Sequence, residues 1–106
     1  MLGVICSSAG NHAQAVSHHS TRLGIDGLIV MPETTPYVKV KMTQRFGAKV
    51  LLHGENYDEA YAKAREIAER EGRVFVHAFN DAQVVAGQGT VALELLEENA
   101  YLVMKI

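Results

Sequence analysis

Two hydroxyl groups, an amide and an imidazole stand together near the amino end of this 106-residue sequence, in Ser7-Ser8-Ala9-Gly10-Asn11-His12. An apolar run, Leu2–Cys6, leads into this hexapeptide, and Ala13–Val16 continues from it with helical character. This order is typical of a turn between a strand and a helix. The first N–H groups of such a helix lack partners inside it, so the turn predicts a site for a carboxylate or a phosphate. A capped turn without a ligand fits equally well, because Ser and Asn are also common capping residues.

The elements that must position this turn can be read from the apolar pattern. Four short apolar runs are predicted to be strands: Gly3–Cys6, Gly27–Met31, Lys49–Leu52 and Arg73–Val76. Helical patterns separate these runs, and strands alternating with helices through short loops give a parallel sheet covered by helices. The expected fold class is α/β, with a small open parallel sheet of about four strands and flanking helices in three layers. The order of the strands stays open.

Two helices are expected between the first three strands. The first runs from about Asn11 to Leu23 and stops at Gly24. The second has Thr35 as its cap and Pro36 in its first turn, and it ends at Gly47. Apolar residues at four-residue steps are expected to form the face of this second helix: Val38, Met42 and Phe46.

The third helix has the clearest pattern and ends at Gly72. Its apolar face consists of Tyr57, Ala60, Tyr61, Ala64, Ile67 and Ala68. On the other side, Glu59 with Lys63 and Glu66 with Arg70 form acid-first pairs, each contributing about 0.2–0.5 kcal/mol. Two further helices are predicted after the last strand, a short one over Asp81–Ala86 and another over Thr90–Glu97 that Thr90 caps.

The hexapeptide is the best candidate site, because ligands gather at the carboxyl ends of the strands in an open parallel sheet. A metal site is not expected. The five histidines, His12, His18, His19, His53 and His77, nowhere show the H-x-x-x-H spacing that places two imidazoles on one helical face. Cys6–Gly10 differs at its first residue from the G-x-S-x-G nucleophile elbow, so we do not assign it that function.

Composition limits the class of protein. The sequence is 48% apolar and 21% charged, with a net charge of −2, and its length indicates one small domain over residues 1–106. No basic run points to nucleic acid as a partner, and no apolar stretch reaches the ~20 residues that span a bilayer. Cys6 is the one cysteine, so no intrachain disulfide is possible and a cytoplasmic location is expected.

The segment Ser8-Ala9-Gly10-Asn11-His12-Ala13-Gln14 resembles the S-x-G-N-H-x-Q loop of the serine/threonine dehydratase and serine racemase family, pyridoxal-phosphate enzymes of fold type II. Three further stretches agree in order and approximate spacing. They are Val30–Pro36 with Lys39-Val40, Phe46–Val50, and Ala86–Thr90 with Ala92–Glu94. The resemblance covers about residues 3–99. It implies the small, mobile domain of such an enzyme, with residues 90–106 forming the helix and tail that lead back to the large domain.

The resemblance also implies roles for individual residues. The loop of the family holds the substrate α-carboxylate, which assigns substrate binding to Ser8, Ala9, Gly10, Asn11 and His12. The family asparagine, here Asn11, also contacts the ring oxygen of the cofactor. Asn80 stands where related enzymes place an Asp or Asn near the substrate. Racemases often carry a second serine at the position of Ala9, and a methyl group cannot transfer a proton, so the dehydratase branch is favoured.

Two parts of the family chemistry are not found in these 106 residues. The resembled enzymes need a lysine that forms a Schiff base, upstream of the S-x-G-N-H loop, and a downstream glycine loop for the cofactor phosphate. None of the lysines here matches, so no catalytic residue is assigned. The chain alone is expected to show no turnover and to retain no pyridoxal phosphate, whereas the intact enzyme would eliminate water from L-serine or L-threonine.

Two alternatives remain at this stage. One is a racemase-like fragment. The other is a stand-alone interaction or scaffold domain, because separation from a large domain would expose apolar surface around Val91, Leu95 and Leu96. The second alternative predicts a homodimer or a higher homo-oligomer, built on this helix or on a sheet edge.

Overall fold

A four-stranded parallel sheet forms the centre of the fold. The computed structural model describes residues 3–104, with strands β1 (Val4–Ser7), β2 (Gly27–Met31), β3 (Lys49–Leu52) and β4 (Val74–Phe75). The strands lie in the order β3-β2-β1-β4, and all three pairings are parallel. The predicted fold class is confirmed, β2 and β3 have their predicted bounds, and the structure supplies the strand order.

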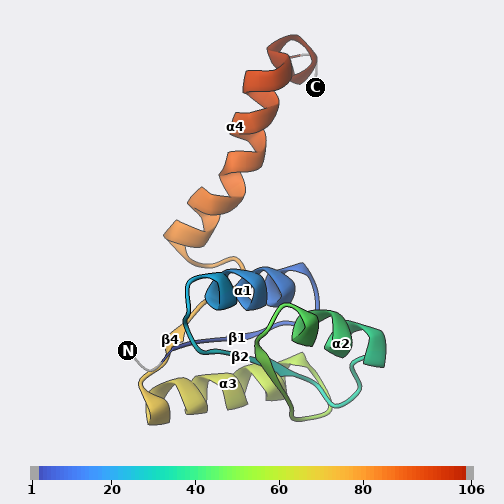
Figure 1. The fold of residues 1–106 in the computed structure, drawn as a ribbon, viewed down its shortest axis with the longest axis vertical. Helices are drawn as coiled ribbons and strands as arrows, with labels where there is room; N and C mark the ends of the chain where they lie inside the picture. Colours follow the sequence, from blue (N-terminus) through green and yellow to red (C-terminus); the bar gives the residue numbers. More distant parts are fainter. Residues whose placement is uncertain (1–2, 105–106) are drawn as a thin grey trace.

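Helices cover both faces of the sheet and give the predicted three layers (Figure 1). On one face lie α1 (Asn11–Arg22) and α2 (Tyr37–Arg45), and on the other lies α3 (Tyr57–Glu71). Successive strand residues point to opposite faces, so two apolar cores form. The core beneath α1 and α2 consists of Cys6, Ala13, Ile29, Met31, Val40 and Ala48. The core against α3 consists of Ile5, Val30, Ala60, Ala64 and Ile67.

A buried serine joins the two helices of the first face. Ser17 Oγ donates to Thr43 O at 2.8 Å and accepts from Ala48 N at 2.9 Å. The Ser17 and Thr43 side chains are fully buried, and their hydroxyl groups are hydrogen-bonded, as buried polar groups require. These bonds fix α1 against α2 and against the chain entering β3.

The start of α2 differs from the prediction. Pro36 has an extended backbone (ψ 138°) and occupies the cap position, so the helix begins at Tyr37 and has no side-chain cap. The prediction of Thr35 as the cap is therefore wrong. The N–H of Thr35 donates instead to Pro32 O at 3.1 Å and closes the preceding turn.

The predicted apolar face of α2 is also wrong. Val38, Met42 and Phe46 are exposed, by 62%, 41% and 39%, and the helix buries Val40 and Thr43. The physical reason is that α2 packs beside β3, the edge strand of the sheet. No further element among the described residues covers the outer side of the helix, so side chains there stay exposed.

Both ends of α3 are determined by local sequence. Asn56 Oδ1 accepts from Glu59 N at 2.9 Å and caps the helix, and Glu59 Oε2 accepts at 2.6 Å from the N–H of Glu55, the residue before the cap. The predicted stop at Gly72 is confirmed, because this residue has the left-handed conformation (φ 67°) in which helices commonly end.

One of the two predicted ion pairs on α3 forms. Glu66 Oε1 lies 3.4 Å from Arg70 Nη1, as expected. The Glu59–Lys63 pair is wrong, because the Glu59 carboxylate is engaged in the helix cap and Lys63 Nζ lies 3.3 Å from Glu66.

A single helix, α4 (Ala82–Met104), replaces the two helices predicted after β4. The break expected at Gly87–Gly89 is wrong. Thr90 does not cap a new helix, because its Oγ1 donates to Gly87 O at 2.7 Å inside a continuous one. Each glycine costs a helix only about 1 kcal/mol relative to alanine, which the surrounding helix formers outweigh. The backbone leaves helical geometry later, at Asn99 (φ −155°, ψ 70°).

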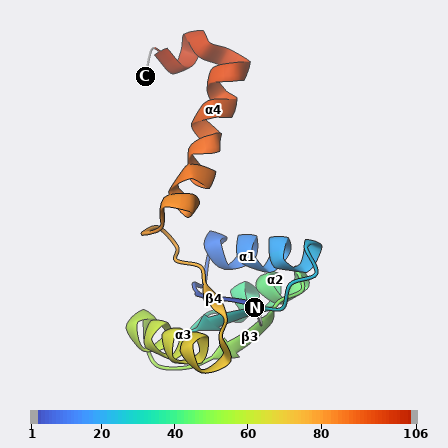
Figure 2. The ribbon, with the colours of Figure 1, turned by 90° about the vertical axis from the view of Figure 1, so that its left-hand side faces the viewer.

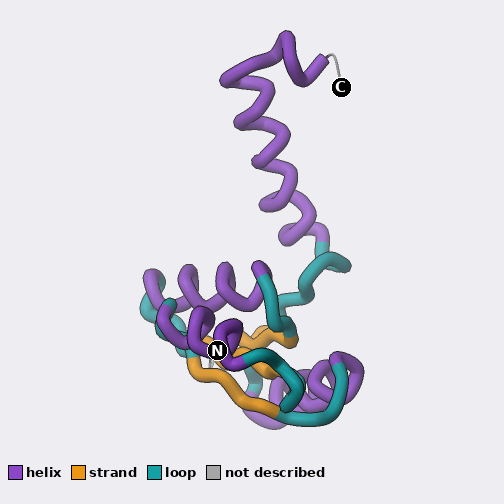
Figure 3. Tube along the Cα trace, turned by 90° about the vertical axis from the view of Figure 1, so that its right-hand side faces the viewer, coloured by secondary structure: helices purple, strands orange, loops and turns teal. Residues whose placement is uncertain are grey.

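The long helix points away from the sheet and its covering helices (Figures 2 and 3). The radius of gyration is 15.6 Å, against about 13 Å for a compact chain of this length. Within residues 3–104, no helix has both the length and the apolarity to cross a membrane. The last two residues of the predicted tail, 105 and 106, lie outside the described residues.

Candidate functional site

The hexapeptide forms the predicted connection between β1 and α1, at the carboxyl edge of the sheet. Ser8 Oγ accepts hydrogen bonds from Gly10 N and Ala13 N, both at 3.2 Å. A hydroxyl group has two acceptor lone pairs and one proton to donate. Because both lone pairs of Ser8 Oγ are engaged, the remaining capacity of this group is to donate. A donor at this place suits an oxyanion.

Backbone donors follow Ser8 along the loop and into the first turn of α1. Within the part of the chain that the structure describes, the N–H groups of Ala9, Asn11 and His12 have no hydrogen-bond partner. The first turn of α1 holds no acidic residue, so its own side chains leave the positive end of the helix dipole unneutralised. A Cβ built on Gly10, the cap residue, would meet nothing within 4 Å, so the loop is open to a ligand. The loop is both a capped turn and a set of unfilled donors.

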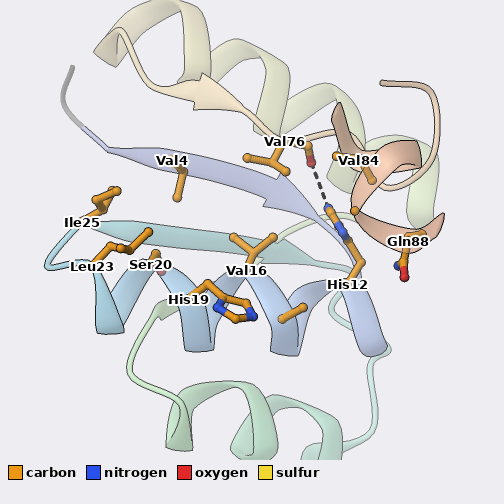
Figure 4. Close-up of a pocket in the computed structure, with 12 residues that line it drawn as sticks. Val4, His12, Val16, His19, Ser20, Leu23, Ile25, Val76, Val84 and Gln88 are labelled. Atoms are coloured by element: carbon orange, nitrogen blue, oxygen red, sulfur yellow. Dashed lines mark hydrogen bonds between the residues drawn. The ribbon is translucent and has the colours of Figure 1, made fainter. Parts of the chain in front are cut away.

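The His12 side chain anchors this loop to β4. His12 Nε2 lies 3.0 Å from Val76 O, and since a carbonyl only accepts, the imidazole donates from Nε2 (Figure 4). The imidazole is half-buried and is thereby held in place. The backbone N–H of His12, which has no partner among the described residues, is a donor that a ligand could use.

The two candidate asparagines lie on different elements. Asn11 is the first residue of α1, is exposed, and its side-chain amide makes no hydrogen bond to the described residues. Asn80 lies between β4 and α4, where its N–H donates to His77 Nδ1 at 2.9 Å. The N–H of Phe79 donates to the same atom at 3.2 Å, so His77 folds this segment into a turn. No hydrogen bond among the described residues joins Asn80 to the loop of Ser8.

Ser7 belongs to the hexapeptide but was not among the predicted site residues. Its side chain is 3% exposed, and among the described residues Ser7 Oγ has no hydrogen-bond partner. Strand alternation places Ser7 on the side of Ile5, toward α3, and opposite to Cys6. The period-two pattern of β1 was the available signal, because it places the fourth strand residue inside the α3 core.

Cys6 does not act as a nucleophile in this fold. Its side chain is fully buried in β1, and burial raises the pKa of the thiol from 9.0 to about 12. A neutral, enclosed thiol is unreactive, in agreement with the interpretation of the broken elbow motif. Across residues 3–104, no three His, Cys, Asp or Glu side chains are grouped to hold a metal ion.

Comparison with known families matches nearly the whole chain. A model described as "Pyridoxal-phosphate dependent enzyme" matches residues 2–104. This chain belongs to the pyridoxal-phosphate dependent enzyme family. The resemblance inferred from the loop is therefore confirmed, and so is the expected cofactor of the family, pyridoxal phosphate.

Curated relatives in this family include threonine dehydratases. The biosynthetic L-threonine dehydratase of Escherichia coli is 54% identical over 100 residues, covering 94% of this chain and 20% of that protein. The catabolic L-threonine dehydratase of the same organism is 50% identical over 96 residues, covering 91% of this chain and 29% of that protein. The chain thus spans between a fifth and a third of the length of these relatives.

Solved structures of family members share the fold. Threonine deaminase isoform 2 from Solanum lycopersicum superposes with a TM-score of 0.86 at 42% identity, over 91% of this chain and 26% of that chain. Maize serine racemase gives a TM-score of 0.88 at 33% identity, over 93% of this chain and 30% of that chain. Dehydratases and racemases therefore both contain this arrangement of elements.

Proposed function

We propose that this chain carries the substrate-carboxylate loop of a pyridoxal-phosphate-dependent L-threonine or L-serine dehydratase. The observation that carries the proposal is the loop of donors, in which three backbone N–H groups and the Ser8 hydroxyl proton are unfilled and no acid lies in the adjoining helical turn. Hydrogen bonds from backbone N–H groups and a hydroxyl to a carboxylate are charge-assisted and stronger than those between neutral groups. Asn80 would border the substrate from the segment after β4.

Asn11 fits the cofactor of the family, because its amide is exposed and makes no hydrogen bond to the described residues. In the proposed enzyme this amide orients the cofactor by its ring oxygen. Pyridoxal phosphate, when bound, supplies the electron sink for charge that develops at the substrate α-carbon. A neutral hydrogen bond contributes only about 1 kcal/mol net, so the residues of this chain orient the cofactor but do not retain it alone.

Elimination is favoured over racemisation by Ala9. Its methyl group stands in the loop between Ser8 and Gly10 and can neither give nor take a proton, whereas racemisation needs an acid or base on each face of the α-carbon. The identities support the same choice, at 54% to a dehydratase and 33% to a racemase structure.

The proposal includes a division of labour between two domains. The residues described here would form the small domain of a cytoplasmic enzyme, and residues 90–106 would lead to a large domain that carries the Schiff-base lysine. The first lysine in these 106 residues is Lys39, on α2, which follows the loop. The Schiff-base lysine of the resembled enzymes precedes the loop, so Lys39 is not assigned that role. The 106-residue chain alone is expected to form no 2-oxobutanoate from L-threonine with added cofactor, and measurable formation would contradict this division.

A chimera tests the proposed role directly. Residues 3–99 replace the matching segment of the Escherichia coli biosynthetic dehydratase, and formation of 2-oxobutanoate from L-threonine is measured. We expect an active chimera, in which Ser8→Ala raises KM about 10-fold or more, because a hydrogen bond to a charged group contributes about 1.5–3 kcal/mol. Thr34→Ala, on a different loop, is the matched control. An active chimera in which Ser8→Ala leaves KM unchanged would refute the assignment.

A second candidate function is self-association, favoured by the exposed apolar residues of α4. Val91, Leu95 and Leu96 are exposed by 58%, 50% and 45%. A chain of this kind would be a homo-oligomeric interaction domain. Sedimentation of the purified chain over a range of concentrations tests it, and a mass that stays at 11.6 kDa throughout would reject it.

A further inference from the structure

The segment between β4 and α4 is fixed at both of its ends. At its start, Val76 O accepts from His12 Nε2 at 3.0 Å (Figure 4). At its end, Asp81 Oδ1 accepts from Gln83 N at 2.8 Å and caps α4. The residues between these two ends include Asn80, which is proposed above to border the substrate.

The His77 side chain holds the middle of this segment. Its Nδ1 accepts from Asn80 N at 2.9 Å and from Phe79 N at 3.2 Å. A neutral imidazole has one nitrogen that accepts and one that donates. Because two N–H groups converge on Nδ1, this nitrogen is the acceptor and the ring proton is on Nε2. Among the described residues, neither N–H group has another hydrogen-bond partner.

Aromatic contacts keep the His77 ring in place. The ring meets Phe79 edge to face with the centroids 4.6 Å apart, and it meets Tyr61 of α3 in the same way at 6.0 Å. The ring of Phe75, on β4, lies 6.2 Å away. His77 is half-buried, whereas Asn80 is exposed and its side-chain amide makes no hydrogen bond to the described residues. The ring is thus a fixed support, and the amide of Asn80 is left available to a ligand.

We propose that His77 is a positioning residue of the candidate site, and that its uncharged ring holds Asn80 at the substrate. This inference rests on the proposed function, in which Asn80 borders the substrate, and it adds the group that places Asn80 there. A ring that gains a proton at Nδ1 becomes a donor at both nitrogens, so it can no longer accept from Asn80 or Phe79. Substrate affinity should therefore fall as the ring becomes charged, which histidine side chains ordinarily do between about pH 5 and 8.

The other titratable and charged groups around His77 do not share this dependence. They lie on the neighbouring elements and are Tyr57, Tyr61 and Arg65 of α3, Cys6 of β1, His12 of α1 and Asp81 before α4. Of these, only His12 is of a type that ordinarily changes charge between about pH 5 and 8. Its hydrogen bond to Val76 survives that change, because Nε2 carries a proton in both forms. No carboxylate among the described residues forms an ion pair with His77.

Two variants separate the acceptor of His77 from its ring. His77→Asn loses the ring but keeps an acceptor, because the Oδ1 of asparagine stands as far from the backbone as the Nδ1 of histidine. His77→Phe keeps an aromatic ring against Tyr61 and Phe79 but has no acceptor. A role in packing alone would be preserved by phenylalanine, whereas the proposed role is preserved by asparagine.

Nuclear magnetic resonance of the 106-residue chain tests the hydrogen bonds without cofactor or substrate. The ring nitrogen shifts at about pH 8 should show His77 protonated at Nε2 and not at Nδ1. Protection of the Asn80 amide from hydrogen exchange should fall about fivefold or more in His77→Phe, and it should stay near the wild-type value in His77→Asn. A wild-type ring protonated at Nδ1, or protection in His77→Phe that equals or exceeds that in His77→Asn, would overturn the proposal.

The chimera described above tests the consequence for the substrate. At about pH 8, His77→Phe should raise KM for L-threonine about fivefold or more and leave kcat within about twofold, because the lost contact holds the substrate rather than the reacting atoms. His77→Asn should keep the wild-type KM, and it should lack the rise in KM that the wild-type chimera shows from about pH 8 to 6. Added to Asn80→Ala, His77→Phe should have no further effect, because it acts through Asn80.

The outcomes separate this inference from the proposed function. An inactive chimera, or one in which Ser8→Ala leaves KM unchanged, contradicts the proposed function. A chimera in which Ser8→Ala raises KM but His77→Phe does not contradicts only the positioning role of His77. Full addition of the effects of His77→Phe and Asn80→Ala, or a wild-type rise in KM that persists in His77→Asn, also contradicts only that role.

Discussion

Ser7 and Ser8 are neighbours in the chain, and their substitution by alanine should change stability in opposite directions. Ser8 Oγ accepts from Gly10 N and Ala13 N, and it caps the start of α1 from outside the helix. Removing a capping hydroxyl costs about 0.5–2 kcal/mol. Two donors lose their acceptor in Ser8→Ala, but the loop is half-buried and water replaces part of the loss. We expect the free energy of unfolding to fall by about 1–2 kcal/mol.

Ser7→Ala removes a hydroxyl group of the other kind. Ser7 Oγ is buried and has no partner among the described residues, and an unsatisfied buried group of this type carries a penalty of about 1–3 kcal/mol. Alanine keeps the Cβ and deletes one heavy atom, so the cavity left behind is small and offsets only part of the gain. The free energy of unfolding should rise by about 1 kcal/mol. The two variants are then separated by about 2–3 kcal/mol.

Urea unfolding followed by circular dichroism at 222 nm measures both variants against the wild-type chain. The dependence of stability on urea concentration should be unchanged, because neither substitution alters the surface exposed on unfolding. A Ser7→Ala chain that is less stable than wild type would show that the Ser7 hydroxyl has a partner, such as a buried water. A neutral Ser8→Ala would show that the loop does not depend on its hydroxyl.

Three further predictions concern other parts of the fold. Burial raises the pKa of Cys6 from 9.0 to about 12, so between these pH values the folded chain keeps a thiol proton that the unfolded chain releases. The free energy of unfolding should therefore fall by up to about 4 kcal/mol from pH 9 to pH 12, and Cys6→Ala should lack this part of the slope in urea titrations. Ser17→Ala leaves Ala48 N and Thr43 O without their buried partner and should cost about 2–4 kcal/mol by the same titration; an effect below 1 kcal/mol would contradict the role of this serine. The hydrogen bond from Arg73 lowers the pKa of Glu71. The contribution of Glu71 to the free energy of unfolding is therefore present above its pKa in the unfolded chain, and it is lost as the pH falls through its pKa in the folded chain. Acid titration of Glu71→Gln should show a smaller loss of stability below about pH 4.5 than wild type.

The sequence predicted the elements whose signals are local. The bounds of β2 and β3 and the stop of α3 at Gly72 follow from apolar runs and from a residue that readily takes positive φ. The hexapeptide turn was predictable for the same reason, since its small side chains and the helix after it are contiguous. Asp81, which caps α4 by accepting from Gln83 N and Val84 N, also lies at the predicted start of a helix.

The errors arise where tertiary context outweighs local signals. The face of α2 could not be read from its four-residue repeat, because burial depends on α2 covering an edge strand, and strand order was open. The break expected at Gly87–Gly89 depended on glycine propensity, which a long helix overrides. The hydrogen bond between His12 and Val76 joins residues 64 positions apart, and no pattern in the sequence predicts it.

The hydrogen bond between His12 and Val76 helps to fix the shape of the loop within the residues described. Ser8 is held by bonds to Gly10 and Ala13, and His12 is held by β4, so every restraint on the loop comes from the chain itself. A preorganised set of donors loses little entropy when a carboxylate binds. A domain that closes over its substrate needs this property, because the loop must arrive already shaped. The donors of the loop can therefore be tested in the isolated chain, whereas turnover requires the lysine that we propose another domain supplies.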